Sequence, residues 1–102
     1  MDIVHNKELK QNSYTILRQA GYIPIRDRQS GKDSYVLKIH GAHYPRFHLY
    51  VEQEGKTQTK WHMHFDKKEH GWSERRHDTD YDSREVKDEA ARLLRWLGHY
   101  SI

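Results

Sequence analysis

Residues 46–66, RFHLYVEQEGKTQTKWHMHFD, decide the fold that the sequence predicts. Apolar and polar residues alternate on both sides of a short polar segment that contains Gly55. Period-two alternation is typical of strands with one buried face, and a short connection with a glycine is typical of a hairpin. The segment therefore predicts two antiparallel strands. Their core-facing residues would be Phe47, Leu49, Val51, Trp61, Met63 and Phe65.

The register of this hairpin follows from the same alternation. If Glu54 lies opposite Gln58, apolar residues meet apolar residues across the strands, whereas a slip of one residue would set them against polar ones. Opposite charges then also face each other, which stabilises the pairing. The charged pairs are Arg46 with Asp66 and Glu52 with Lys60.

Periodicity predicts one helix on each side of the strands. Residues 7–20 place apolar side chains on one helical face, with Asn6 as N-cap and Gly21 directly after the helix. A second helix begins at about residue 83, with Asp82 as N-cap and Glu85 three residues later, as in a capping box. Its spacing gives an apolar stripe. The stripe consists of Val86, Ala90, Leu93, Leu94 and Leu97.

These elements predict an α+β domain with the order α-β-β-β-α. A third strand, at about residues 35–40, would precede the hairpin and complete a three-stranded antiparallel meander. Both helices are expected to pack on its apolar face, which leaves the polar face open. The 102 residues then form a single domain, with residues 1–6 as an N-terminal tail and residues 67–82 as a polar loop.

Composition limits the classes of function. The chain has no cysteine, which excludes disulfide scaffolds, thiolate metal sites and cysteine nucleophiles and fits a cytoplasmic location. No apolar segment approaches membrane-spanning length, so we expect a soluble protein without a membrane partner. The net charge of +3 and the nine histidines favour polyanionic partners.

The element order resembles that of the double-stranded RNA-binding domain and of the HicA-type toxin ribonucleases. In the HicA family a Gly-Ser-His element near the start of a strand supplies a histidine for RNA cleavage. Gly41-Ala42-His43 looks like this element without its serine, and the resemblance implies a catalytic role for His43. The RNA-binding family has a lysine cluster at the start of its second helix, where carboxylates interrupt the basic residues of this chain.

Several short motifs resemble a group of small uncharacterised bacterial histidine-rich proteins. The motifs are RFH at 46–48, HMHFDKK at 62–68 and YDSREV at 81–86. This resemblance carries no function with it.

The predicted polar face gathers ligands that suit a metal ion. His62, His64 and Asp66 lie on one strand, and the register sets His48 opposite His64. Imidazoles with a carboxylate suit zinc, or a non-haem iron or manganese ion. The alternative is a solvated polar face, because residues two apart on a strand diverge and because Arg46 and Lys38 compete with a cation.

Three hypotheses of function remain open, and whether the protein is an enzyme is one of the open questions. The leading one is a nucleic-acid-binding domain, most simply for RNA. Its contact residues would be Lys38, His40, Arg46, Tyr50, Arg75 and Arg76. The second is a histidine-dependent or metal-dependent phosphodiester hydrolase that uses His43, His48 and His64. The third is a protein-interaction module, homodimeric through an open sheet edge.

Overall fold

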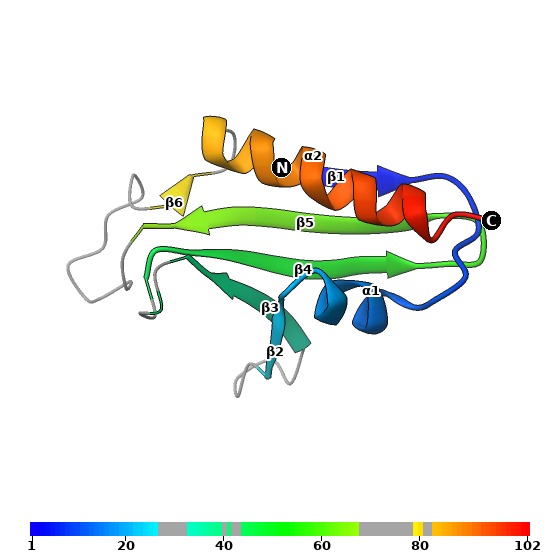
Figure 1. Cartoon of the computed structure of the whole chain (residues 1–102), viewed down its shortest axis with the longest axis horizontal. Helices are drawn as coiled ribbons and strands as arrows, with labels where there is room; N and C mark the ends of the chain where they lie inside the picture. The colour runs from blue at the N-terminus through cyan, green and yellow to red at the C-terminus, as the bar shows by residue number, and fades with distance from the viewer. Residues whose placement is uncertain (27–32, 40, 42–43, 68–78, 81–82) are drawn as a thin grey trace.

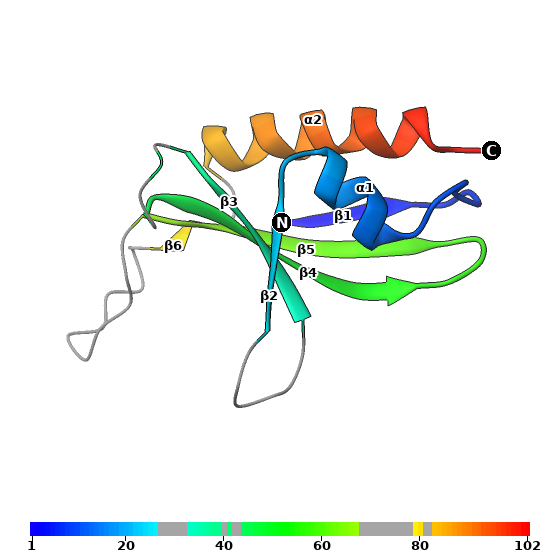
Figure 2. The same ribbon diagram turned by 60° about the horizontal axis from the view of Figure 1, so that its bottom comes forward.

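The computed structural model describes residues 1–26, 33–39, 41, 44–67, 79–80 and 83–102. In this part of the chain two helices cover one face of an antiparallel sheet, which confirms the α+β class (Figures 1 and 2). The elements are β1 (Asp2–His5), α1 (Ser13–Gln19), β2 (Ile23–Arg26), β3 (Asp33–Lys38), β4 (Arg46–Glu54), β5 (Thr59–Asp66), β6 (Thr79–Asp80) and α2 (Arg84–His99).

The sheet is larger than the predicted three-stranded meander. Its spatial order is β1-β5-β4-β3-β2, and the short β6 pairs with the end of β5. The predicted strands form its centre, but the predicted number of strands is wrong. Residues 1–6 are not a tail, because β1 pairs with β5 and the Ile3 side chain is buried in the core. The predicted polar loop at 67–82 contains β6.

The predicted hairpin register is confirmed over the part of the strands that carries the histidines. Residues 46–51 of β4 pair with residues 61–66 of β5 as expected. A β-bulge between Val51 and Gln53 then shifts the register by one, so Glu54 lies opposite Thr59 and not opposite Gln58. The predicted pairing of Glu52 with Lys60 in the ladder is wrong for the same reason.

The bulge places Glu54 on the side of the sheet where α1 packs. A carboxylate oxygen of Glu54 accepts a hydrogen bond from the backbone N–H of Ser13, at 2.5 Å, in the first turn of α1. Asn12 is the N-cap, and its side chain accepts from the backbone N–H of Thr15 at 2.9 Å. The helix therefore begins at Ser13 and not near residue 7, while the predicted position of Gly21, with φ of 104°, is confirmed.

The second helix follows the predicted stripe with one exception. Its N-cap is Ser83, whose hydroxyl accepts from the backbone N–H of Val86, and not Asp82. Leu94 is 45% exposed, whereas the other four stripe residues are buried. Neither of the two helices in the described ranges is long and apolar enough to cross a membrane.

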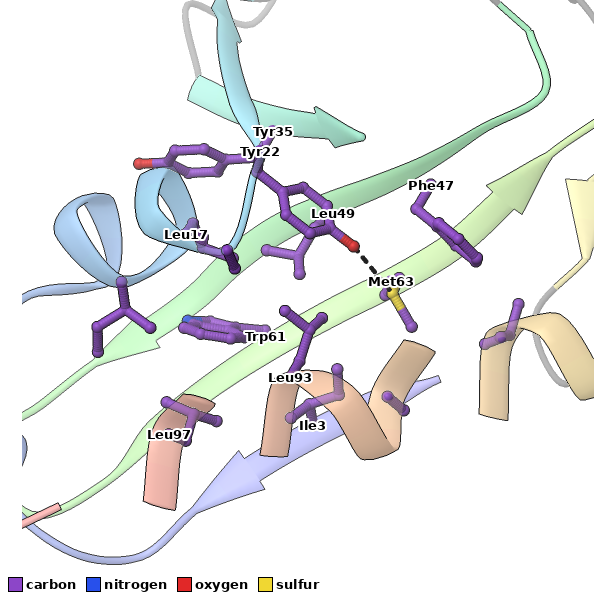
Figure 3. Close-up of a cluster of buried hydrophobic side chains, with 14 of the residues drawn as sticks. Ile3, Leu17, Tyr22, Tyr35, Phe47, Leu49, Trp61, Met63, Leu93 and Leu97 are labelled. Carbon is purple, nitrogen blue, oxygen red and sulfur yellow. Dashed lines mark hydrogen bonds between the residues drawn. The ribbon is translucent and has the colours of Figure 1, made fainter. Parts of the chain in front are cut away.

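The core lies between the helices and the inward face of β4 and β5 (Figure 3). Trp61 is fully buried, and its indole N–H donates to the Ser13 hydroxyl at 2.9 Å. The Tyr22 hydroxyl donates to Glu89 at 2.7 Å and lies 3.8 Å from the Met63 sulfur. Burial and the negative charge of Glu89 raise the pKa of Tyr22, so its hydroxyl stays a donor.

Two neighbouring leucines of α2 test this packing. We expect Leu93→Ala to reduce the free energy of unfolding by about 2–5 kcal/mol, because the side chain is fully buried against the sheet. Leu94→Ala is the matched control and should change it by about 0.5 kcal/mol or less. Urea unfolding followed by tryptophan fluorescence measures both. Similar losses in the two variants would contradict the arrangement of α2.

Candidate functional site

The polar residues of β4 and β5 face away from the helices. Arg46, His48 and Tyr50 alternate with buried core residues on β4, and they lie opposite Asp66, His64 and His62 of β5. This is the arrangement that the sequence predicts. We call this side of the sheet the histidine face.

Asp66 is the centre of the histidine face, because three side chains converge on its carboxylate. His64 Nε2 lies 3.1 Å from Oδ1, and His48 Nδ1 lies 3.5 Å from Oδ2. Arg46 Nε lies 3.5 Å from Oδ2, which confirms the predicted competition of Arg46 for this carboxylate. One carboxylate therefore joins two imidazoles and a guanidinium.

The centre is less exposed than the predicted open face. The side chains of His48 and His64 are 12% and 13% exposed, and that of Asp66 is 5% exposed. The rings of His48 and Tyr50 lie 4.6 Å apart between centroids, and those of His48 and His64 lie 5.0 Å apart, so the aromatic side chains cover one another. The expectation of a fully open face is wrong at these residues.

The surroundings of Asp66 keep its carboxyl group ionised. Burial alone would raise its pKa, but hydrogen bonds and positive charge from His48 and His64 outweigh burial and hold the pKa well below its usual range. An ionised carboxylate at this position can bind a cation or fix the orientation of both imidazoles.

A buried serine fixes the orientation of His48. Ser34 of β3 is 2% exposed, and its hydroxyl lies 2.9 Å from His48 Nε2. The other ring nitrogen, Nδ1, is then the one that faces Asp66. Ser34 was not among the predicted site residues, although its spacing from Val36 and Lys38 places it on the same face of the strand.

His62 does not join this centre, so the predicted set of four metal ligands separates. The rings of His62 and His64 lie 6.5 Å apart, as expected for residues two apart on a strand. His62 Nδ1 is 2.8 Å from a carboxylate oxygen of Asp2, which belongs to β1. The sequence predicts residues 1–6 as a tail, so this partner of His62 could not be predicted.

Two groups of potential metal ligands result within the described ranges. One contains His48, His64 and Asp66, and the other contains Asp2, Glu52 and His62. In each group the donor atoms lie within 4.8 Å of one another. Only the first group lies away from solvent.

The predicted contact residues Lys38 and Arg46 lie side by side. They are directly opposite each other on β3 and β4, on the histidine face. The Arg46 guanidinium also lies over the ring of Tyr44, 4.6 Å from its centroid. Tyr44 precedes Pro45 in the chain, and the sequence already suggests it as a residue on which bases could stack.

Four predicted site residues lie outside the described residues. They are His40, His43, Arg75 and Arg76. The catalytic role that the HicA resemblance implies for His43 stays a prediction.

Comparisons with known proteins assign the chain to no family. No family model matches the chain, and neither the curated proteins nor the solved structures contain a significant match.

Replacement of the central carboxylate tests the ion cluster. We expect Asp66→Asn to reduce the free energy of unfolding by about 1–3 kcal/mol, because the mostly buried Arg46 loses its counter-charge. Asp88→Asn is the control and should change it by about 0.5 kcal/mol or less, since Asp88 is exposed and its ion pair with Arg84 is exposed as well. Equal denaturation midpoints for the two variants would contradict the cluster.

Proposed function

We propose that the protein is a small nucleic-acid-binding domain that contacts phosphates at the end of the histidine face formed by Lys38 and Arg46. The observation that carries this proposal is the placement of these two cations directly opposite each other on adjacent strands. Like charges in such a pair destabilise a sheet. Asp66 offsets the charge of Arg46, and a bound phosphate would offset that of Lys38; a fold tends to break such local rules at functional sites.

The charges around this pair support a phosphate-binding role. Lys38 is exposed, and within the described ranges it forms no ion pair. Arg46 contacts Asp66 only at ion-pair distance, and its buried Nε has no well-oriented hydrogen-bond acceptor in the described part of the chain. The exposed Lys38 ammonium is therefore the group that can bind phosphate oxygens directly, and Arg46 adds positive charge beside it.

The opposite end of the histidine face fits a polyanion less well. Lys60 lies 3.8 Å from carboxylate oxygens of both Asp2 and Glu52, and His62 pairs with Asp2. These carboxylates neutralise the cations and would repel a phosphate backbone. The proposed interface is therefore limited to the end of the sheet where β3 stops and β4 starts.

Single-stranded RNA is the form of nucleic acid that we propose. Proteins bind unpaired bases by stacking them on aromatic rings and on arginine planes. The Arg46–Tyr44 pair offers both kinds of surface beside Lys38. This proposal follows from the site and does not need the topology of the double-stranded RNA-binding domain, whose three-stranded sheet the chain exceeds.

Fluorescence anisotropy with a labelled mixed-sequence RNA tests the interface. The unmodified protein should bind with a Kd on the order of micromolar at 50 mM salt and more weakly at 200 mM. Lys38→Gln should weaken binding and reduce the salt slope by about 0.7, the value for one lost phosphate contact on a single strand. Lys87→Gln is the control, because Lys87 is exposed on α2. Binding that is insensitive to salt, or equal loss in both variants, would refute the interface.

A second candidate function, phosphodiester hydrolysis, is favoured by the convergence of His48 and His64 beside Arg46. One imidazole would accept the proton of the 2′-hydroxyl, whose oxygen attacks phosphorus. The other would protonate the leaving 5′-oxygen as its bond to phosphorus breaks. Arg46 would stabilise the charge on the phosphoryl oxygens.

A ribonuclease assay on EDTA-treated protein tests this second candidate. We expect His64→Ala to lower the rate about 10²–10⁴-fold, the usual contribution of one acid or base. His62→Ala is the matched control, because His62 lies on the same strand face but pairs with Asp2. Equal activity of His64→Ala and the unmodified protein, with both folded by circular dichroism, would exclude the assignment.

A further inference from the structure

We propose that His48, His64 and Asp66 form a binding site for one divalent transition-metal ion of the zinc type, with His48 Nδ1, His64 Nε2 and a carboxylate oxygen of Asp66 as ligands. The proposal rests on the separation of donor atoms in this cluster and holds whether or not the protein binds nucleic acid. It also narrows the four predicted ligands to three, since His62 pairs with Asp2.

Two donor separations in the cluster are close to those of a tetrahedral site, although they involve different oxygens of Asp66. Bonds of about 2.0–2.1 Å to nitrogen and oxygen imply ligand atoms about 3.3–3.4 Å apart. The separations are 3.1 Å between His64 Nε2 and Asp66 Oδ1 and 3.5 Å between His48 Nδ1 and Asp66 Oδ2. The two imidazole donors lie within 4.8 Å and need to move toward each other. An ion that binds one oxygen of Asp66 therefore needs side-chain rotations that bring both imidazoles toward it.

The chemical nature of the ligands selects the type of ion. Two imidazoles with one carboxylate suit zinc and its transition-metal neighbours, whereas calcium and magnesium prefer sites built from oxygen. Three protein ligands leave a fourth position for water or an anion. Lys38 and Arg46, which lie at the same end of the face, are suitably placed to attract such an anion.

Two residues next to the ligands, Ser34 and Arg46, are placed to orient them, as neighbouring residues do in metal sites. Histidine ligands usually make a hydrogen bond through their second ring nitrogen, which fixes the ring and the tautomer. The buried Ser34 hydroxyl is at 2.9 Å from His48 Nε2, so it can accept that bond. Arg46 holds the Asp66 carboxylate on its Oδ2 side, which leaves Oδ1 next to His64.

The other ligand group explains why His62 serves as a control. Asp2, Glu52 and His62 also lie within 4.8 Å of one another, but Asp2 and Glu52 are about half exposed and bind Lys60. Exposed carboxylates are poor ligands, because water competes with the ion for them, whereas Asp66 is mostly buried. Binding at this second group would appear as a loss in His62→Ala.

Isothermal titration of untagged, EDTA-treated protein with zinc sulfate tests the proposal. We expect one ion per chain, and a loss of at least about 100-fold in affinity for His48→Ala and for His64→Ala. Ser34→Ala should lose about 10–100-fold, as is usual for a residue that supports a ligand. His62→Ala should bind as tightly as the unmodified protein. No binding at a 1:1 ratio, or an equal loss in His62→Ala, would overturn the proposal.

A measurement on the unmodified protein keeps the test valid if a variant fails to fold. Nitrogen chemical shifts of the histidine rings identify the nitrogen that coordinates zinc. We expect shifts at Nδ1 of His48 and at Nε2 of His64, with His62 unchanged. Shifts at other histidines, or at Nε2 of His48, would refute the assigned geometry. A bound ion would occupy both imidazoles, so the zinc-loaded protein would not use them as acid and base.

Discussion

The pairing of β4 with β5 is the constraint on which the rest of the structure depends. Six residue pairs are aligned between the two strands. Alternate pairs turn apolar side chains toward the helices, and the others turn polar side chains toward the histidine face around Asp66. A slip by one residue would exchange the two faces, so that the histidines would enter the core and Trp61 would face solvent. Core stability and the geometry of the candidate site therefore have a common cause.

The central pairing could be predicted because its signal is local. Alternation along residues 46–51 and 61–66 determines which side chains share a face, and charge pairs such as Arg46 with Asp66 agree with it. The apolar stripe of α2 was predicted for the same reason, except that Leu94 lies at its exposed border. Agreement between several local signals is what makes such segments predictable.

Elements that depend on distant partners could not be predicted. The four-residue β1 is stable only because β5 pairs with it, and nothing in its own pattern reveals this. Residues 7–12 suggest a helix, but Leu9 pairs with Ser101 and the Lys10 N–H donates to the Tyr100 carbonyl. The site shares this limit in part. Asp2, which diverts His62, belongs to the unpredicted β1, whereas Ser34, which orients His48, lies one residue before the predicted start of its strand.

The β-bulge at Glu52 determines on which face of the sheet Glu54 lies. If residues 51–54 continued as a regular strand without the bulge, Glu54 would point to the histidine face, as Arg46, His48 and Tyr50 do. Its carboxylate could then no longer accept the hydrogen bond from the backbone N–H of Ser13. The first turn of α1 would lose this bond, which adds to the one that Asn12 accepts from Thr15. A change that straightens β4 at this point without removing a residue would thus act on a helix whose first residue lies 41 positions earlier, so the bulge and the docking of α1 are coupled.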